Sequence, residues 1–290
     1  MHEFPDRPFL DAFLAPYLRR DGNDVSVTRE GIRRLARELH GGEREVMAGL
    51  LRRGLWPARF SRSRGALPAE GLARLLETRV LVAGCGGLGG HAAELLARMG
   101  VGALTLCDPD RFEESNLNRQ RFCTEATLGA FKAEVCRDGI LASASYMDVE
   151  ARVEALDEDN LPGFLAKTDA VMDCLDSLAR KSMLEQAARK AGVLCVQAAV
   201  ARNEGLCLVD DGQAPPFSRV CPGEEAGNRE GAPMNAHALT VTGTACLMVA
   251  LLVRRLCAGK NDAGTLFHLD MSLPELERFA LSPLPEAHTL

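Results

Sequence analysis

Four glycines that follow an apolar run are the residues of this chain best suited to chemistry. The segment G-C-G-G-L-G at 84–89 comes directly after the apolar run 80–83, and a helical pattern follows over 91–99. Because glycine has no Cβ, a phosphate can approach the backbone N–H groups of such a turn, and the positive end of the following helix favours its charge. The candidate nucleotide-binding residues of this turn are Gly84, Gly86, Gly87 and Gly89.

An acidic segment follows the glycine turn. A second apolar run, 103–107, ends at Asp108, nineteen residues beyond Gly89, and Asp108-Pro109-Asp110 begins the next loop. A dinucleotide-binding fold places an acid here to bind the ribose hydroxyls. Up to this point the pattern also suits a dehydrogenase.

Cations beyond Asp110 change that interpretation. The loop S-N-L-N-R-Q-R at 115–121 contains Asn116 and Arg119, and Lys132 begins a further helix. A nicotinamide cofactor has only a pyrophosphate to neutralise. Two or three cations and an amide on one glycine loop favour a triphosphate with its metal, because prepositioned donors must hold the charge on the reacting phosphorus.

A third apolar strand carries the candidate metal ligand. The segment D-A-V-M-D-C at 169–174 runs into Leu175-Asp176-Ser177, and Ser177 is a suitable N-cap for a helix that extends to Lys190. Mg²⁺ prefers one or two carboxylates and keeps its other positions for phosphate and water. Asp173 and Asp176 both stand at a strand's carboxyl end, where α/β sheets bind ligands, so either could hold the metal.

The elements that must position these residues form an α/β fold. Strands 80–83, 103–107 and 169–174 each precede a loop and a helix, which predicts a Rossmann-like sheet with a parallel half. Further strands are expected at 193–199, 205–209, 265–271 and 277–281, the last two as an antiparallel pair. The long helix 237–256 is expected in the core, and the loop 210–236 has no periodic pattern.

Residues 1–56 differ from the remainder, which we take as a second domain, 57–290. Helical spacing at 11–19, 28–39 and 43–53 predicts a small helical module, with Thr28 as an N-cap. From Arg19 to Arg64 there are twelve Arg against six acids. A docking appendage with a solvated basic face is favoured over a DNA-binding helix-turn-helix, and gripping a peptide or protein partner is a third use.

Composition limits the cellular compartment and the classes of partner that we expect for this protein. The 290 residues carry a net charge of −6, include no apolar run long enough to span a bilayer, and begin without a signal-peptide pattern. We expect a cytoplasmic protein that binds neither nucleic acid nor membrane. The ten cysteines include no C-x-x-C pair, and four in apolar strands are expected to be reduced and buried: Cys107, Cys174, Cys195 and Cys207.

Taken together, the motifs resemble the ThiF/MoeB/HesA family, bacterial relatives of ubiquitin-activating enzymes. They are G-C-G-G-L-G at 84–89, D-P-D at 108–110, S-N-L-N-R-Q at 115–120, L-G-x-x-K at 128–132 and D-C-L-D-S at 173–177, and R-F-S-R at 59–62 resembles the family's R-Y-S-R segment. The resemblance, which covers roughly 59–281, implies a homodimer. It also implies adenylation by ATP and Mg²⁺ of the C-terminal Gly-Gly carboxylate of a ubiquitin-like sulfur-carrier protein, with a separate sulfur donor protein as a further partner.

The resemblance also implies roles for individual residues. Asp108 would hold the ribose, with Asp110 in the same motif. Asn116, Arg119 and Lys132 would hold the phosphates, and Asp176 the Mg²⁺. Arg62 would reach the γ-phosphate in the partner subunit. The catalytic set is therefore Arg62, Arg119, Lys132 and Asp176.

Two departures from the family pattern concern cysteine. Ser218 stands where the first cysteine of a zinc-binding pair would be and no second pair follows, so we expect no structural zinc. Cys221 is the only cysteine of the loop 210–236 and the one candidate for a transfer nucleophile. Nearby Arg219 favours its thiolate while Glu224 and Glu225 oppose it, so we expect adenylation and sulfur transfer to proceed without it.

Two alternatives remain open. Some members of the family adenylate a ribosomal peptide held by an N-terminal clamp, a role that the module 1–56 could fill. The non-enzyme alternative is an NAD-binding or nucleotide-sensing regulator whose helical module touches DNA. The molybdopterin and thiamine pathways would leave the same residues.

Overall fold

The nucleotide-binding half of the molecule is built on one eight-stranded mixed sheet. The computed structural model describes residues 4–213, 215–220 and 235–281. The strands lie in the order β11-β10-β9-β8-β7-β4-β5-β6, parallel from β8 to β6 and antiparallel from β8 to β11. The predicted fold class, a Rossmann-like α/β domain with a parallel half and antiparallel C-terminal strands, is confirmed.

Each glycine-loop or acidic segment follows a strand of the parallel half. The strands of this sheet are β4 (Arg79–Ala83), β5 (Ala103–Cys107), β6 (Asp148–Arg152), β7 (Ala170–Asp173), β8 (Leu194–Ala201), β9 (Glu204–Asp210), β10 (Thr265–Asp270) and β11 (Glu275–Ala280). Ala83 pairs with both Cys107 and Asp173, so the ends of β4, β5 and β7 lie level with one another. This register brings the three functional loops to one edge of the sheet.

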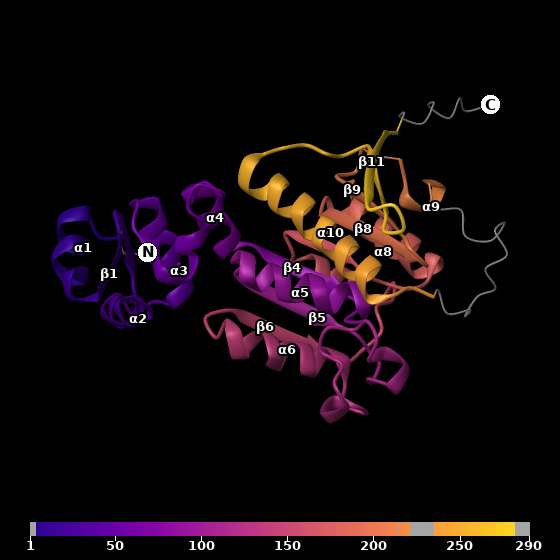
Figure 1. Cartoon of the computed structure of the whole chain (residues 1–290), viewed down its shortest axis with the longest axis horizontal. Helices are drawn as coiled ribbons and strands as arrows, with labels where there is room; N and C mark the ends of the chain where they lie inside the picture. The colour runs from indigo at the N-terminus through magenta and orange to yellow at the C-terminus, as the bar shows by residue number, and fades with distance from the viewer. Residues whose placement is uncertain (1–3, 214, 221–234, 282–290) are drawn as a thin grey trace.

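Two apolar clusters cover the two faces of the sheet. Val80 and Val82 point into a large cluster formed with α4 (Ala69–Glu77), α5 (Gly87–Met99), α6 (Lys132–Ser143) and α10 (Ala238–Ala258). Leu81 and Ala83 point into a smaller cluster formed with α7 (Leu161–Leu165) and α8 (Leu178–Ala191). This alternation along β4 follows from the period of two of a strand, and it makes β4 a central strand buried on both sides. Figure 1 shows α5 and α10 lying together over one face.

The helices agree closely with the expected segments. Their bounds are α4 (Ala69–Glu77), α5 (Gly87–Met99), α6 (Lys132–Ser143), α7 (Leu161–Leu165), α8 (Leu178–Ala191), α9 (Phe217–Val220) and α10 (Ala238–Ala258). Ser177 caps α8 as predicted, since its side chain accepts from the N–H of Arg180. The strand β6 and the short helices α7 and α9 were not expected.

The N-terminal module is not purely helical, and that prediction is wrong in this respect. It contains α1 (Arg7–Leu14), α2 (Arg29–Glu38) and α3 (Glu43–Arg52), together with a three-stranded sheet of β1 (Leu18–Asp21), β2 (Asp24–Val27) and β3 (Trp56–Pro57). The first helix begins and ends earlier than the expected 11–19, because Asp6 caps its start and a short 3₁₀ turn follows from Ala15. The N-cap at Thr28 is confirmed.

The module packs on the rest of the chain through α3 and α4. Leu50 and Leu51 belong to the same buried cluster as Leu75 and Leu76. Arg52 adds a bidentate ion pair to Glu77 at 2.7 Å. Figure 1 shows α4 between the module and the sheet. The boundary at residue 56 stays a prediction, since one core continues across it.

Among the residues that the structure describes, α10 alone is long and apolar enough to cross a bilayer. Its inner face is buried and packs on α5, β8 and β9. The expectation of a core helix therefore agrees with its position.

Substitutions at the adjacent Gly89 and Gly90 test how tightly the glycine loop is packed. A Cβ at Gly89 would clash with the carbonyl oxygen of Gly84, whereas a Cβ at Gly90 would meet its nearest atoms at an ordinary 3.6 Å. We expect Gly89→Ala to lower the free energy of unfolding by about 1–3 kcal/mol, as overpacking does. Chemical denaturation measures this, and nucleotide binding should weaken as well.

Gly90→Ala is the matched control for this variant. It should be neutral or stabilising, because alanine favours a helix over glycine by about 1 kcal/mol. Equal stabilities of the two variants would contradict this description of the loop.

Candidate functional site

The glycine loop turns sharply between β4 and α5. Gly84 has φ +89°, a backbone conformation that favours glycine, and its N–H donates to the carbonyl of Cys107 at 2.8 Å. A Cβ at Gly84 would lie 2.8 Å from the carbonyl oxygen of Cys174, the residue after β7. The loop therefore passes between the ends of β5 and β7, and α5 begins at Gly87 with its N–H groups toward the same edge.

Asp108 holds this loop in place. One carboxylate oxygen accepts from the N–H of Cys85 at 2.6 Å and the other from the N–H of Asp110 at 2.8 Å. Its side chain is buried, and burial raises the pKa of the carboxyl group, while the two backbone N–H groups and Lys132 oppose that rise. Both oxygens of Asp108 are thus engaged in fixing the backbone around the predicted ribose position.

Asp110 is the more accessible acid of the pair. Its side chain is 63% exposed and accepts from the Nζ of Lys132 at 2.9 Å. The Lys132 side chain is only 10% exposed, so its ammonium reaches this place from the first residue of α6. The structure therefore brings Asp110 and Lys132 together, and Asp108 links them to the glycine loop.

The loop 115–121 lies against the glycine turn. A Cβ at Gly87 would lie 3.9 Å from Cγ of Arg119, and a Cβ at Gly86 would lie 3.5 Å from Nε2 of Gln120. The guanidinium of Arg119 donates to Ser115 O and to Asn118 Oδ1, each at 2.9 Å. Both acceptors are neutral, and no carboxylate among the residues that the structure describes pairs with Arg119.

Hydrogen bonds of buried polar groups fix the conformation of the loop 115–121. Asn116 is buried, and its Oδ1 accepts from the N–H of Glu113 at 3.1 Å. His91 Nε2 lies 3.2 Å from the carbonyl of Arg119 and donates to it. Burial lowers the pKa of His91, so the imidazole is neutral and tethers Arg119. His237 is likewise structural, because it caps α10 by accepting from the N–H of Thr240.

Gln120 is a residue that the motif analysis did not single out. It is buried, and its Oε1 has no hydrogen-bond partner among the residues that the structure describes. Its amide faces Gly86. The signal that could have found it is its place one residue after Arg119 in the S-N-L-N-R-Q motif.

The structure separates the two acids of the third strand. Asp173 is fully buried and paired with Lys181 at 3.1 Å, whereas Asp176 is exposed in the loop before α8. A buried carboxylate already matched by an ammonium has no need of a metal. Asp176, next to the Cys174-Leu175 turn that contacts Gly84, is therefore the acid available to a ligand.

The donor set around Asp176 suits Mg²⁺ rather than a metal held by the protein alone. Among residues 4–213, 215–220 and 235–281, no group of three or more His, Cys, Asp or Glu side chains could hold a metal ion. Mg²⁺ usually binds one or two carboxylates together with phosphate oxygens and water, so a single exposed carboxylate in the turn that contacts the glycine loop fits it.

Arg62 is not brought to this site. It follows the N-terminal module and its guanidinium pairs with Asp21 of β1 at 2.9 Å. Its side chain is 91% exposed, so this ion pair contributes little and leaves the arginine free to move.

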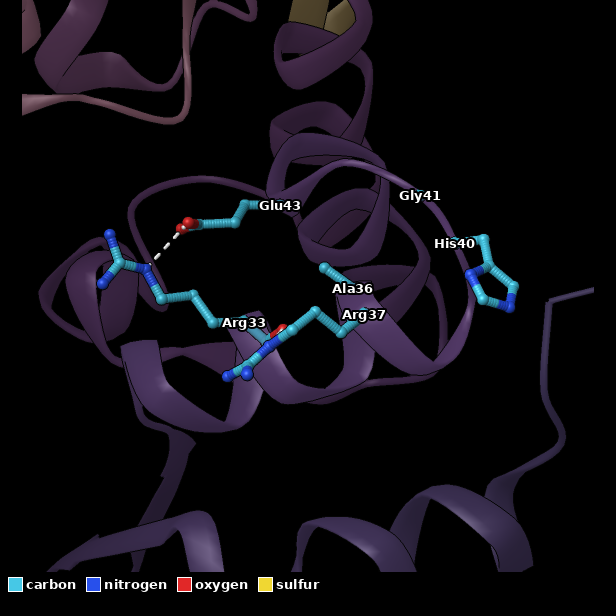
Figure 2. A pocket seen from close by; sticks show the side chains of 6 residues that line it. All are labelled: Arg33, Ala36, Arg37, His40, Gly41 and Glu43. Carbon is cyan, nitrogen blue, oxygen red and sulfur yellow. Dashed lines mark hydrogen bonds and ion pairs between the residues drawn. The ribbon is translucent and has the colours of Figure 1, made fainter.

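One surface hollow lies away from the glycine loop. It has a volume of about 540 Å³ and lies on the N-terminal module between α2 and α3. Figure 2 shows Arg33 directed at Glu43, with which it makes an ion pair at 2.9 Å, and Arg37 running back along α2. Because Arg33 is paired within the module, the hollow lacks the concentration of unpaired cations that a nucleic-acid surface requires.

The cysteines that the structure describes are all free. Cys107, Cys195 and Cys207 are buried in strands as predicted, whereas Cys174 is half-buried and lies just after β7. All four are poor nucleophiles. Burial raises the pKa of Cys107 and of Cys174 to about 12, and it also raises the pKa of Cys195 and Cys207. Cys221 lies outside the described residues, so its role stays a prediction, as does the expected absence of zinc.

Comparison with known proteins assigns the chain to a family. Residues 60–288 match the ThiF family, and the chain therefore belongs to it. The molybdopterin-synthase adenylyltransferase of Escherichia coli K12 is 38% identical over 140 residues, 48% of this chain and 56% of that protein. The adenylyltransferase and sulfurtransferase MOCS3 of Drosophila grimshawi is 34% identical over 227 residues, 74% of this chain and 49% of that protein. The chain thus spans about half the length of these relatives.

Solved structures agree on the fold. Escherichia coli MccB with MccA-N7isoASN superposes with a TM-score of 0.69 at 16% identity, over 79% of this chain and 74% of that one. PaaA superposes with a TM-score of 0.63 at 20% identity, over 96% of this chain and 82% of that one. At these identities the similarity shows the fold alone.

Thiol labelling tests the assignment of the strand cysteines. A thiol with a pKa of about 12 is on the order of 10⁻⁴ ionised near pH 8. We expect iodoacetamide to modify Cys107 and Cys174 far more slowly in the folded protein than in denaturant, as peptide mass spectrometry would show. Labelling of Cys174 in the folded protein at the rate seen in denaturant would contradict the assignment.

Proposed function

We propose that this protein is an ATP-dependent adenylyltransferase that activates the C-terminal Gly-Gly carboxylate of a ubiquitin-like sulfur-carrier protein. The observation that carries the proposal is the convergence of Arg119, Lys132 and Asp176 on one glycine loop. Two cations and a metal-binding acid around a phosphate loop suit a triphosphate better than a dinucleotide. The names of the relatives in the same family support this chemistry.

The reaction needs alignment more than acid-base catalysis. A carboxylate is already ionised at neutral pH, so an oxygen of the carrier's terminal carboxylate attacks the α-phosphorus directly. The bond from that phosphorus to the bridging oxygen breaks, and pyrophosphate leaves. Arg119 and Lys132 neutralise charge on the phosphates, while the N–H groups at the start of α5 orient them.

The two acids after β5 take separate roles in the proposal. Asp108 keeps the glycine loop in shape through its bonds to Cys85 and Asp110. Asp110 is exposed at the same edge, so we assign the ribose hydroxyls to Asp110, with Asp108 behind it. Lys132 then lies between the ribose and the phosphates.

Asp176 would hold Mg²⁺ when the nucleotide is bound. The metal would supply charge neutralisation on the phosphate oxygens. What the chain itself contributes is the exposed carboxylate of Asp176. It lies three residues after the end of β7, next to the residues that contact Gly84.

Release of the acyl group completes the proposed cycle. A sulfur nucleophile from a separate donor protein attacks the acyl carbon, and AMP leaves. No cysteine of this chain is required for that step, in keeping with the raised pKa of the strand thiols. Free, reduced cysteines suit a cytoplasmic enzyme.

A second copy of the chain is the proposed partner at α10. From Ala238 to Val253 this helix has no charged residue, and its outward positions include Leu239, which is 65% exposed. An uncharged helix face of this length on a soluble enzyme suits a homodimer interface. A dimer would also allow Arg62 to act in the partner's site.

A ribosomal peptide held by the N-terminal module is the second candidate substrate. The match to PaaA covers 96% of this chain and so extends over most of that module. β1 is an edge strand whose Arg19 and Arg20 are exposed, and an extended peptide can pair with such an edge. A DNA-binding regulator is less well supported, because Arg33, Arg52 and other arginines of the module pair with acids.

Exchange of labelled pyrophosphate into ATP tests adenylation. We expect exchange only when a carrier ending in Gly-Gly, or a peptide substrate, is present. Arg119→Ala should reduce the exchange rate by on the order of 10²-fold or more, the scale seen when one preorganised donor is removed. Arg121→Ala is the matched control, since Arg121 is two residues away and pairs with Glu94 at 2.5 Å. Similar rates in both variants would refute the triphosphate site.

Mixed subunits test the role of Arg62 in the partner's site. Neither Arg62→Ala nor Asp176→Asn should be active alone. Mixing them should restore part of the activity, because one of the two sites in a mixed dimer would have neither change. Absence of rescue, when native mass spectrometry shows that subunits have exchanged, would place Arg62 in its own subunit's site, and an active Arg62→Ala chain would place it in none.

A further inference from the structure

A buried ion pair lies directly beneath the turn that carries Asp176. Asp173, the last residue of β7, is fully buried, and Lys181 of α8 is 3% exposed. The ammonium of Lys181 donates to the carboxylate of Asp173 at 3.1 Å and to its backbone carbonyl at 3.2 Å. Burying two charges is costly, so a pair kept in this place calls for a reason beyond stability.

The carboxylate of Asp173 is itself the anchor of the turn. The oxygen that accepts from Lys181 also accepts from the N–H of Leu175 at 3.1 Å, and the other oxygen accepts from Gln197 Nε2 at 3.3 Å. Leu175 immediately precedes Asp176. The hydrogen bond from the Leu175 N–H therefore depends on the Asp173 carboxylate, and Lys181 holds that carboxylate in place.

The other end of the same turn is the start of α8. Ser177 is the N-cap, and its carbonyl accepts at 2.9 Å from the backbone N–H of Lys181, an ordinary helical bond. Asp176 thus lies between Asp173, which the Lys181 side chain holds, and the N-cap of α8. The turn reaches the glycine loop as well, because Cys174 O contacts the Cβ position of Gly84.

The outer side of the pair is closed by α9. The ring of Phe217 lies with its centroid 5.9 Å from the ammonium of Lys181, and Phe217 is fully buried. Its N–H donates to Glu185, one helical turn after Lys181, at 2.8 Å. Water is therefore excluded from the pair, which strengthens the attraction within it.

We infer that the buried pair of Asp173 and Lys181 is a positioning element, which fixes the turn 174–176 and thereby aims Asp176 at the metal and phosphates. The inference rests on the proposed assignment of Asp176 to Mg²⁺. Lys181 touches no substrate atom itself. Outer residues that orient a metal ligand typically change metal affinity by about 10- to 100-fold when removed.

The test requires a variant that removes the pair without leaving a charge unpaired. Lys181→Met alone would strand the carboxylate of Asp173 in the core. The combined change Asp173→Val, Lys181→Met and Gln197→Met replaces the whole polar group by apolar side chains, an exchange that cores often tolerate. Lys190→Met, on an exposed position of the same helix, is the matched control.

Two measurements read the position of the turn. The first is hydrogen exchange at the Leu175 amide without any ligand, which should become at least about tenfold faster in the triple variant as its acceptor is lost. The second is Mn²⁺ binding, followed by electron paramagnetic resonance with a non-hydrolysable ATP analogue, whose half-saturating concentration should rise about 10- to 100-fold. Lys190→Met should match the wild type in both.

A folded triple variant with wild-type exchange at Leu175, or with wild-type Mn²⁺ binding, would overturn the positioning role of the Asp173–Lys181 pair. Asp176→Asn separates this failure from that of the proposed function. If Asp176→Asn weakens Mn²⁺ binding and the triple variant does not, only the positioning role is wrong. If Asp176→Asn binds Mn²⁺ normally, the metal assignment itself is wrong, and the positioning role is wrong with it.

Discussion

The candidate site depends on the absence of a side chain at residue 89. Only glycine there lets the first turn of α5 close on the carbonyl of Gly84, and that closure sets where the helix N–H groups point. Gly84 in turn lies against the carbonyl of Cys174, so the loops after β4 and β7 are in backbone contact. A substitution that moves one of these loops should therefore move the other as well.

The parts of the fold predicted from sequence are those that rest on local signals. The apolar runs of β4 and β5 lead into glycine or aspartate, and Ser177 stands before a helical pattern, so each element was located within a residue or two. α6 begins at Lys132 as expected. Such elements need no knowledge of their neighbours, because burial on both faces and capping are visible in the sequence itself.

Other features depended on contacts between distant residues. β6 reads D-V-E-A-R and has no apolar run, since it is an edge strand with alternately exposed residues. The hairpin of β1 and β2 was not predicted, because the N-terminal module was interpreted as helical. The D-G pair at 21–22 is nevertheless a turn signal. The choice between Asp173 and Asp176 could not be made from the strand alone, because it depends on Lys181 in the following helix.

The shared core of α3 and α4 determines which part of this chain could be exchanged as a unit. Leu50 and Leu51 pack in one cluster with Leu75 and Leu76, and Arg52 bonds to Glu77. A chimera joined at residue 56 would bring together two half-interfaces that were never selected for each other. A junction after α4, at residue 77, would keep α3 and α4 together but would separate α4 from α10, where Arg74 donates to the carbonyl of Cys257 at 2.9 Å. Helix α4 thus joins the module to the sheet domain on both of its sides, and exchange of either part alone should lower stability.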